Sequence, residues 1–205
     1  MIHLQYSAIV FDLGNVLLPF DYNFAINELN KIEKGLGDKF IEFYNSNYQF
    51  HRDFESSKIS ELSFINKMLE VVGHKIDSDT FCKLFSEIFT LNEDVVSLLS
   101  VLKKNYKLFL LSNTNSIHQK YGWRKFEFLK YFDKLILSHE VGAIKPEEKI
   151  YKAVENASGY PAKEHFYIDD IQEYVDAAIE LGWDAIQFVG YEKLLSDLRI
   201  RKILN

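Results

Sequence analysis

Four polar segments of the chain carry residue types that suit phosphate chemistry. The first holds Asp12, whose carboxylate could attack phosphorus or bind a metal ion, and Gly14, which lets the chain turn tightly and present a backbone carbonyl. The second holds Ser112 and Asn113, whose hydroxyl and amide groups can donate hydrogen bonds to phosphate oxygens. Taken singly, these segments also suit a turn aspartate and an ordinary helix cap.

The two later segments add a lysine and a pair of carboxylates. Lys145 precedes Pro146, whose ring restricts Lys145 to an extended conformation, and Pro146 suits the first turn of a helix. Asp169 and Asp170 follow an apolar run, where adjacent carboxylates need a positive charge nearby. Mg²⁺ meets that need because it prefers carboxylate oxygens. A solvent-exposed lysine and a helix cap at Asp170 are the alternatives.

Five short apolar runs and the longer amphipathic stretches between them predict an α/β fold with a Rossmann-like parallel sheet. The expected strands are residues 8–11, 108–111, 135–137, 166–168 and 185–188. Ligands of open parallel sheets bind outside the carboxyl ends of the strands, so the four polar segments are expected to converge on one site. Their combination of nucleophile, phosphate donors, cation and carboxylate pair suits phosphoryl transfer.

The long stretch between the first two expected strands has helical periodicity and no convincing strand alternation. Ser60 precedes one apolar stripe and is an expected helix start. We expect an inserted subdomain of three to four helices. The predicted division is a core domain of residues 1–20 and 92–205, with a helical cap at residues 21–91.

Composition narrows the classes of function. The 205 residues are 47% hydrophobic and 26% charged, which excludes a disordered chain, a collagen-like fibre and a coiled coil. The net charge of −6 gives no support to nucleic-acid binding, and Cys82, the single cysteine, can form neither an internal disulfide nor a cysteine-rich zinc site. No apolar run approaches the roughly 18 residues of a membrane span. Residues 1–6 do not have the pattern of a signal peptide, so we expect a cytoplasmic protein with no membrane partner.

In order along the chain, the four polar segments resemble the motifs of the haloacid dehalogenase (HAD) superfamily of hydrolases. The matching residues are 12–16, 111–115, Lys145 with Pro146, and Asp169 with Asp170. The resemblance covers essentially the whole chain, because the helical insert lies where this family places its helical cap. Residues 11–16, 111–115 with His118, and 54–60 also resemble the α-D-glucose-1-phosphate phosphatase-like members of the family.

The resemblance implies a magnesium-dependent phosphatase that acts through an aspartyl-phosphate intermediate. Its substrate would be a small phosphomonoester, with a sugar phosphate as one candidate. Asp12 would be the nucleophile. Mg²⁺ would be held by the Asp12 carboxylate, the Gly14 backbone carbonyl and Asp170, with Asp169 acting from beside the metal through water.

The same resemblance assigns other polar groups to the substrate. Ser112 and Asn113 would hold the transferring phosphoryl group, and Lys145 would neutralise its charge and orient the nucleophile. Water would then hydrolyse the intermediate. The cap residues that could line a sugar pocket are Tyr44, Tyr48, Phe50 and Glu55.

Two positions depart from the pattern of the family. Gly14 stands where most of its phosphatases have an aspartate that protonates the leaving oxygen, and Tyr174 stands where an asparagine is common. The general acid is therefore open, and the candidates are Asp21, His51, Asp53 and Glu55. The departures keep a catalytically weak binding or regulatory protein as an alternative. A 2-haloacid dehalogenase needs no metal, so the pair of acidic residues argues against it.

Overall fold

The centre of the fold is a five-stranded sheet in which every neighbouring pair of strands is parallel. The computed structural model describes residues 5–204, so most of the N-terminal stretch assessed above for a signal peptide lies outside the described residues. The strand order is β3-β2-β1-β4-β5. The strands are β1 (Ala8–Phe11), β2 (Lys107–Ser112), β3 (Lys134–Leu137), β4 (His165–Asp169) and β5 (Asp184–Gln187). This confirms the predicted α/β, Rossmann-like class.

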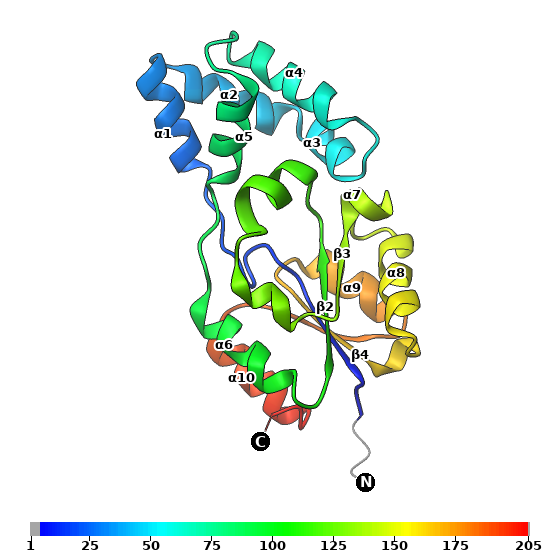
Figure 1. Cartoon of the computed structure of the whole chain (residues 1–205). Helices are drawn as coiled ribbons and strands as arrows, with labels where there is room; N and C mark the ends of the chain where they lie inside the picture. The colour runs from blue at the N-terminus through cyan, green and yellow to red at the C-terminus, as the bar shows by residue number, and fades with distance from the viewer. Residues whose placement is uncertain (1–4, 205) are drawn as a thin grey trace.

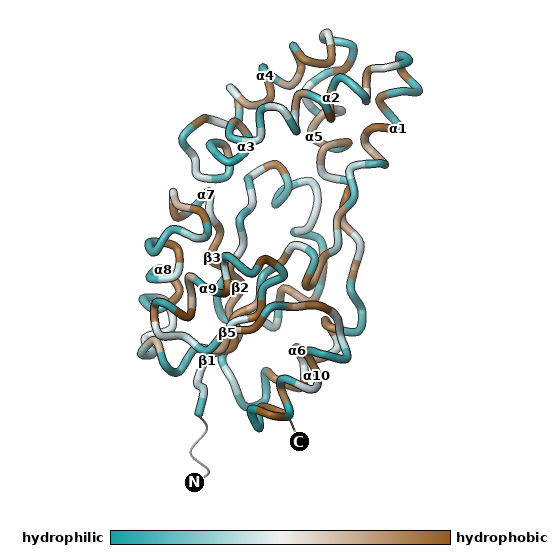
Figure 2. The backbone as a smooth tube through the Cα atoms, turned by 180° about the vertical axis from the view of Figure 1, so that it is seen from behind, coloured by the Kyte–Doolittle hydropathy of each residue, from teal (hydrophilic) through white to brown (hydrophobic). Residues whose placement is uncertain are grey.

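Helices cover both faces of the sheet, so its strands are apolar on both sides. In β1, Ala8 and Val10 join the cluster that includes helices α8 and α9, whereas Ile9 and Phe11 join the cluster that includes α6 and α10. The bounds are α6 (Glu93–Leu102), α8 (Glu148–Ser158), α9 (Gln172–Glu180) and α10 (Tyr191–Ile200). Figure 1 shows these two layers, and in Figure 2 strongly hydrophobic stretches gather around the strands.

Five helices between β1 and α6 form a separate group, which we call the helical unit (residues 23–86). They are α1 (Asn23–Ile32), α2 (Leu36–Ser46), α3 (Tyr48–Glu55), α4 (Glu61–Val71) and α5 (Ser78–Ser86). The expectation of three to four helices was wrong, because the backbone leaves helical geometry at Asn47 and separates α2 from α3. Ser60 caps α4 as expected, since its hydroxyl accepts a hydrogen bond from the Ser63 N–H at 3.1 Å.

The helical unit has its own apolar core and is tied to the sheet by two neighbouring segments. Phe40, Phe64 and Phe85 are each about 1% exposed within this core. The two connecting segments, 17–21 and 88–92, hydrogen-bond to each other through their backbones. These two hydrogen-bonded segments therefore hold the helical unit above the carboxyl ends of the strands (Figure 1).

Shorter elements complete the described part of the chain. They are η1 (His118–Trp123), η2 (Glu127–Tyr131), α7 (Ser138–Val141) and η3 (Ala162–Glu164). None of the helices in residues 5–204 combines the length and the apolar character needed to cross a bilayer.

Candidate active site

Asp12, Ser112 and Asp169 come together because three adjacent parallel strands end at one edge of the sheet. β2, β1 and β4 are neighbours, and the polar residues lie at or just after their carboxyl ends. The Asp12 N–H donates to the Ile168 carbonyl at 2.9 Å, which places Asp12 beside Asp169. The convergence expected from the strand pattern is therefore present in the structure.

Lys145 joins this group from a loop and is only 1% exposed. Its Nζ lies 2.8 Å from Asp12 Oδ1 and 2.6 Å from Asp169 Oδ2. The Lys145 N–H donates to Asn113 Oδ1 at 2.7 Å, which fixes the loop against the end of β2. The ring of Tyr174 lies 5.1 Å from the ammonium group. The alternative of a solvent-exposed lysine is wrong.

The prediction that Pro146 lies in the first turn of a helix is also wrong. Helix α8 begins at Glu148, and a turn precedes it in which the Glu147 N–H donates to the Ile144 carbonyl at 2.8 Å. Pro146 therefore belongs to this turn. The turn, rather than a helix terminus, carries Lys145 to the acidic residues.

The site holds three carboxylates and one buried ammonium group. Burial, with the charges of Asp169 and Asp170, raises the pKa of Asp12 from 3.8 to about 8, although Lys145 acts in the opposite direction. Burial likewise raises the pKa of Asp170. Burial acts to lower the pKa of Lys145, but the two neighbouring carboxylates raise it above its ordinary value and keep it charged. One lysine cannot balance three carboxylates, so the site favours a further cation.

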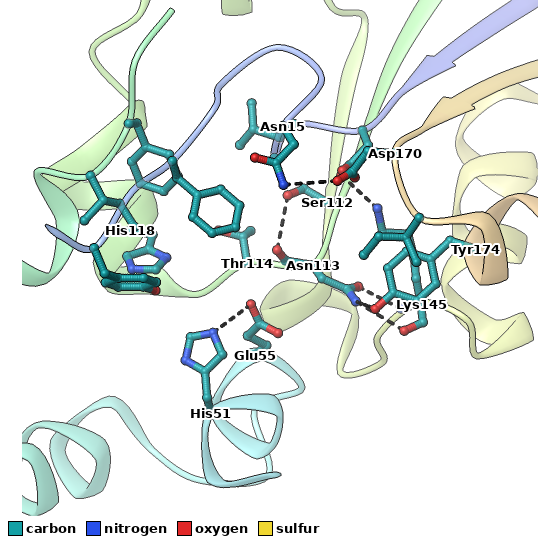
Figure 3. Close-up of a pocket in the computed structure, with 18 of the residues that line it drawn as sticks. Asn15, His51, Glu55, Ser112, Asn113, Thr114, His118, Lys145, Asp170 and Tyr174 are labelled. Atoms are coloured by element: carbon teal, nitrogen blue, oxygen red, sulfur yellow. Dashed lines mark hydrogen bonds and ion pairs between the residues drawn. The ribbon is translucent and has the colours of Figure 1, made fainter. Parts of the chain in front are cut away.

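The acidic residues fit a hard divalent ion. One oxygen from each of Asp12, Asp169 and Asp170 lies within 4.8 Å of the others. Asn15 donates to Asp170 Oδ2 at 3.0 Å and so orients that carboxylate (Figure 3). The Gly14 carbonyl accepts the Val16 N–H at 2.6 Å, which leaves it a second lone pair. Such oxygen ligands suit Mg²⁺.

Asp169 differs from the other two carboxylates because both of its oxygens already accept hydrogen bonds from other groups of the protein. Oδ2 accepts from Lys145 and from the Tyr167 hydroxyl, and Oδ1 accepts from the Ile171 N–H at 2.8 Å. These bonds lock Asp169 in place, and it is fully buried. The arrangement suits the indirect role expected of Asp169 better than direct metal binding.

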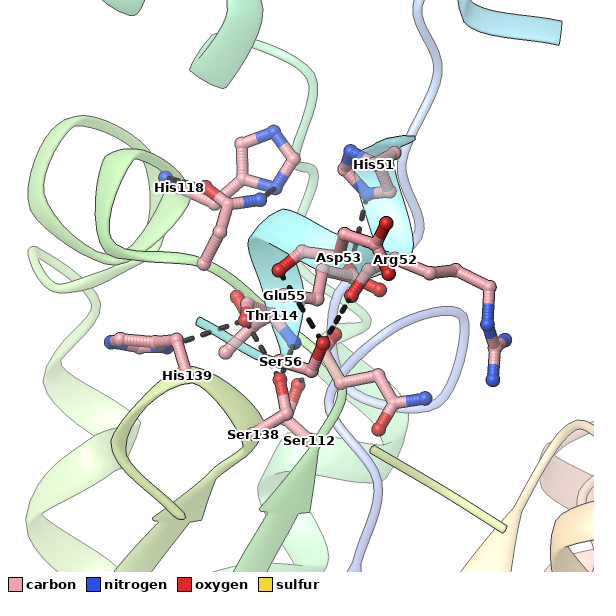
Figure 4. Close-up of polar contacts among 12 residues, drawn as sticks. His51, Arg52, Asp53, Glu55, Ser56, Ser112, Thr114, His118, Ser138 and His139 are labelled. Carbon is pink, nitrogen blue, oxygen red and sulfur yellow. Dashed lines mark hydrogen bonds and ion pairs between the residues drawn. The ribbon is translucent and has the colours of Figure 1, made fainter. Parts of the chain in front are cut away.

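The loop after β2 is held rigidly beside this cluster. The Thr114 N–H donates to Ser138 Oγ at 2.9 Å, and the same hydroxyl donates to the Thr114 carbonyl at 2.8 Å (Figure 4). Asn113 Nδ2 donates to the Lys145 carbonyl at 3.2 Å. Ser112 and Asn113 both line the cavity next to Asp12, where they can meet a phosphate.

A cavity of about 140 Å³ lies between the strand ends and the helical unit. One water needs roughly 10–15 Å³ by this measure, so the space suits a small organic molecule. The residues of the sheet domain that line it are Asp12, Leu13, Gly14, Asn15, Ser112, Asn113, Thr114, His118, Lys145, Asp170, Ile171 and Tyr174. The others are Phe20, Tyr22, Tyr44, Tyr48, His51, Glu55, Ile88 and Phe89.

Only some of the cap residues that the sequence suggested for a sugar pocket or a general acid line the cavity. Tyr44, Tyr48, His51 and Glu55 line it. Phe50 does not, because its ring packs against Phe64 at 5.5 Å. Asp53 instead accepts from Gln49, and Asp21 is exposed and accepts from Asn23. His51 and Glu55 thus remain as the general-acid candidates that face the cavity.

Arg52 is a functional candidate that sequence reasoning missed. Its guanidinium donates from α3 to the Lys145 carbonyl at 3.2 Å and to the Tyr174 hydroxyl at 3.4 Å. The same hydroxyl accepts from Asn113 Nδ2 at 3.4 Å. Tyr174 therefore links the helical unit to the loop after β2. Arg52 follows His51 in a charged helix, so no local pattern marks it.

We expect Tyr174→Phe to raise the KM for a phosphomonoester by roughly two- to tenfold, with little change in thermal stability. Asn113 and Arg52 would each lose a partner while the ring stays packed. Steady-state kinetics test this, with Tyr160→Phe as a matched control outside the cavity. An unchanged KM in the Tyr174→Phe variant would show that the phenol does not position Asn113.

His118 is a fully hydrogen-bonded core histidine. Its Nδ1 lies 3.2 Å from Asn115 Nδ2, and its Nε2 lies 3.1 Å from the Phe85 carbonyl. The neutral ring satisfies both contacts, with Nε2 donating and Nδ1 accepting. Burial, and next the proximity of His51, holds the pKa of His118 well below 6.5, although the Phe85 carbonyl acts in the opposite direction. His118 thus joins the sheet domain to α5.

This histidine should make the fold sensitive to acid. Below pH 6.5 the unfolded chain takes up a proton that folded His118 refuses, so the free energy of unfolding falls as the pH falls. The loss should grow as the pH falls further below 6.5. Denaturant unfolding at pH 5 and 7 should show a smaller difference for His118→Gln than for the wild type. The exposed control His74→Asn should keep the wild-type difference, and equal differences in all three proteins would contradict the assignment.

This chain is similar to known proteins both in sequence and in fold. The sequence profile described as haloacid dehalogenase-like hydrolase matches residues 6–182. A D-ribitol-5-phosphate phosphatase of Bacteroides thetaiotaomicron is 26% identical over 87% of this chain and 90% of its own length. A pyrimidine 5'-nucleotidase of Escherichia coli is 23% identical over 88% and 86%. A HAD family enzyme of B. thetaiotaomicron, crystallised with magnesium and inorganic phosphate, has a TM-score of 0.73 and 29% identity over 89% and 93%.

Proposed function

The chain belongs to the haloacid dehalogenase-like hydrolase family, and we propose that it is a magnesium-dependent phosphatase of small phosphorylated metabolites. The observation that carries this proposal is the cluster of Asp12, Lys145, Asp169 and Asp170 at the carboxyl ends of the strands, beside a cavity of small-molecule size. Two relatives named above as a phosphatase and a nucleotidase support it, because both names imply hydrolysis of a phosphomonoester.

In this proposal Asp12 is the nucleophile. A carboxylate oxygen of Asp12 forms a bond to phosphorus while the bond from phosphorus to the leaving oxygen breaks, and the leaving oxygen takes up a proton from water or from one of the general-acid candidates, His51 and Glu55. Water then attacks phosphorus, releases phosphate and restores the carboxylate. Lys145, 2.8 Å from Asp12, acts to lower the pKa of the nucleophile against the effect of burial and holds it in one orientation.

Asp12, Asp170 and the Gly14 carbonyl would hold Mg²⁺, and Ser112 and Asn113 would bind the phosphoryl oxygens. The metal would draw negative charge from the phosphoryl group and lower the pKa of the neighbouring carboxylates. Bonds from the chain to both oxygens of Asp169 support its indirect role.

We also propose that residues 21–91 act as a cap on a core of residues 1–20 and 92–205. The helical unit contributes Tyr44, Tyr48, His51 and Glu55 to the wall of the cavity, opposite the acidic cluster. Such a position lets a cap exclude water and contact the leaving group. The size of the cavity suits a small phosphomonoester, and a sugar or polyol phosphate is the leading class of substrate. The cytoplasmic location stays a prediction.

The test is phosphate release from p-nitrophenyl phosphate and a panel of sugar and polyol phosphates, with Mg²⁺ and with EDTA. We expect release with Mg²⁺ and its loss with EDTA. No release from any substrate at high enzyme concentration would favour a catalytically weak binding protein, with Gly14 and Tyr174 as the first residues to exchange. Halide release from a 2-haloacid without metal would instead favour a dehalogenase.

A further inference from the structure

His51 and Glu55 form a buried hydrogen-bonded pair that lines the cavity from the helical unit. They lie one turn apart on α3, and His51 Nε2 is 3.1 Å from Glu55 Oε1. Their side chains are only 6% and 10% exposed, and both line the cavity. Figure 3 shows Glu55 between His51 and the loop that carries Asn113 and Thr114. Part of a ligand that extends from the phosphate towards the helical unit would meet this pair.

The pair has bonding capacity that the described chain does not use. His51 Nδ1 is buried, and within residues 5–204 it has no hydrogen-bond partner. Buried polar atoms in native proteins nearly always have a partner, so an unpaired one in a cavity wall indicates a group supplied from outside. Glu55 uses Oε1 for His51, and its second oxygen can accept a hydrogen bond from a ligand hydroxyl.

The surroundings of the pair are polar, and the arginine whose charge reaches Glu55, Arg52, is not part of the cavity wall. Burial above all, and also the Glu55 charge, raises the pKa of Tyr22, Tyr44 and Tyr48, so these hydroxyls stay neutral. Among the described lining residues, Lys145 is the one lysine or arginine, and two carboxylates already engage it. Arg52 directs its guanidinium at the Lys145 carbonyl and at Tyr174, and it is not a lining residue.

We propose that His51 and Glu55 select the leaving group, accepting a neutral one that bears hydroxyl groups and rejecting one that carries a second negative charge. The proposal rests on the phosphatase function proposed above. A hydroxyl can donate to Glu55, and the tyrosine hydroxyls can donate to it in turn. A carboxylate or second phosphate in the same place would face the Glu55 charge, and the described cavity wall has no lysine or arginine that is free to bind it.

The test compares two substrates of equal length, glycerol 3-phosphate and 3-phosphoglycerate, which differ in a terminal CH₂OH or carboxylate. In the wild type we expect kcat/KM for glycerol 3-phosphate to be higher by at least about tenfold, because like charges repel strongly in a poorly hydrated cavity. Glu55→Gln keeps the shape of the side chain and removes its charge, so the ratio should fall towards one. The matched control Asp79→Asn, on the surface of α5, should keep the wild-type ratio.

The possible outcomes distinguish a failure of this inference from a failure of the proposed phosphatase function. Absence of turnover of p-nitrophenyl phosphate by the wild type would defeat the proposed function itself. Turnover of that substrate together with equal use of the two glycerol compounds by the wild type would overturn the selection by Glu55. The same conclusion would follow if Glu55→Gln kept the wild-type ratio. Because the wild-type ratio alone can contradict the proposal, the test stands even if the variant fails to fold.

Discussion

Asp12→Asn should lower kcat for every phosphomonoester substrate by at least about 10³-fold while the protein stays folded. The amide has nearly the same shape but cannot attack phosphorus as a carboxylate does. Folding should survive because burial and two neighbouring carboxylates already raise the pKa of Asp12 to about 8, so the charge is unfavourable where it stands. Without metal, the melting temperature of the variant should equal or exceed that of the wild type.

Steady-state phosphate release and thermal unfolding, measured on the same preparation, check both halves of this prediction. The matched control is Asp176→Asn, on the outer face of α9, which should leave rate and melting temperature near the wild-type values. Turnover by Asp12→Asn at the wild-type rate would assign the nucleophile to another residue. A variant that is inactive because it has unfolded would show a low melting temperature.

Lys145→Met should abolish activity and lower the free energy of unfolding by about 3–5 kcal/mol, as is usual when one partner of a buried ion pair is removed. Asp12 and Asp169, at 6% and 0% exposure, would then face each other with no ammonium group between them. The methionine fills a similar volume, so the effect reports charge rather than a cavity.

Chemical denaturation at neutral pH measures this loss. Lys149→Met is the matched control, since that lysine is exposed on α8 and should change stability by less than about 0.5 kcal/mol. Added Mg²⁺ should restore stability to Lys145→Met more than to the wild type, because it supplies positive charge to the same carboxylates. Equal stability of the two variants would show that Lys145 does not hold the cluster together.

The parts of the fold that the sequence predicts well are those set by short-range rules. Buried parallel strands need continuous apolar runs, and all five runs became strands. Because the strands are parallel, residues after them had to meet at one edge. The parallel arrangement of the strands is therefore enough to predict that Asp12, Ser112 and Asp169 lie close together.

The parts that the sequence could not supply depend on packing between distant elements. The burial of Lys145 comes from a turn that docks on Asn113, and periodicity says nothing about it. Arg52 and Tyr22 reach the site because α3 and the start of α1 lie over the strand ends. The break between α2 and α3 at Asn47 could not be predicted, because no glycine or proline lies at that position.

The most direct test of the central claim is a crystal structure of the wild type grown with Mg²⁺ and beryllofluoride, which mimics a phosphoryl group bonded to a carboxylate. The proposed function predicts beryllofluoride on Asp12, with Mg²⁺ bound by Asp12, Asp170 and the Gly14 carbonyl at about 2.0–2.1 Å. Beryllofluoride on any other side chain, Mg²⁺ held outside this cluster, or a cluster left empty at saturating concentrations would contradict it.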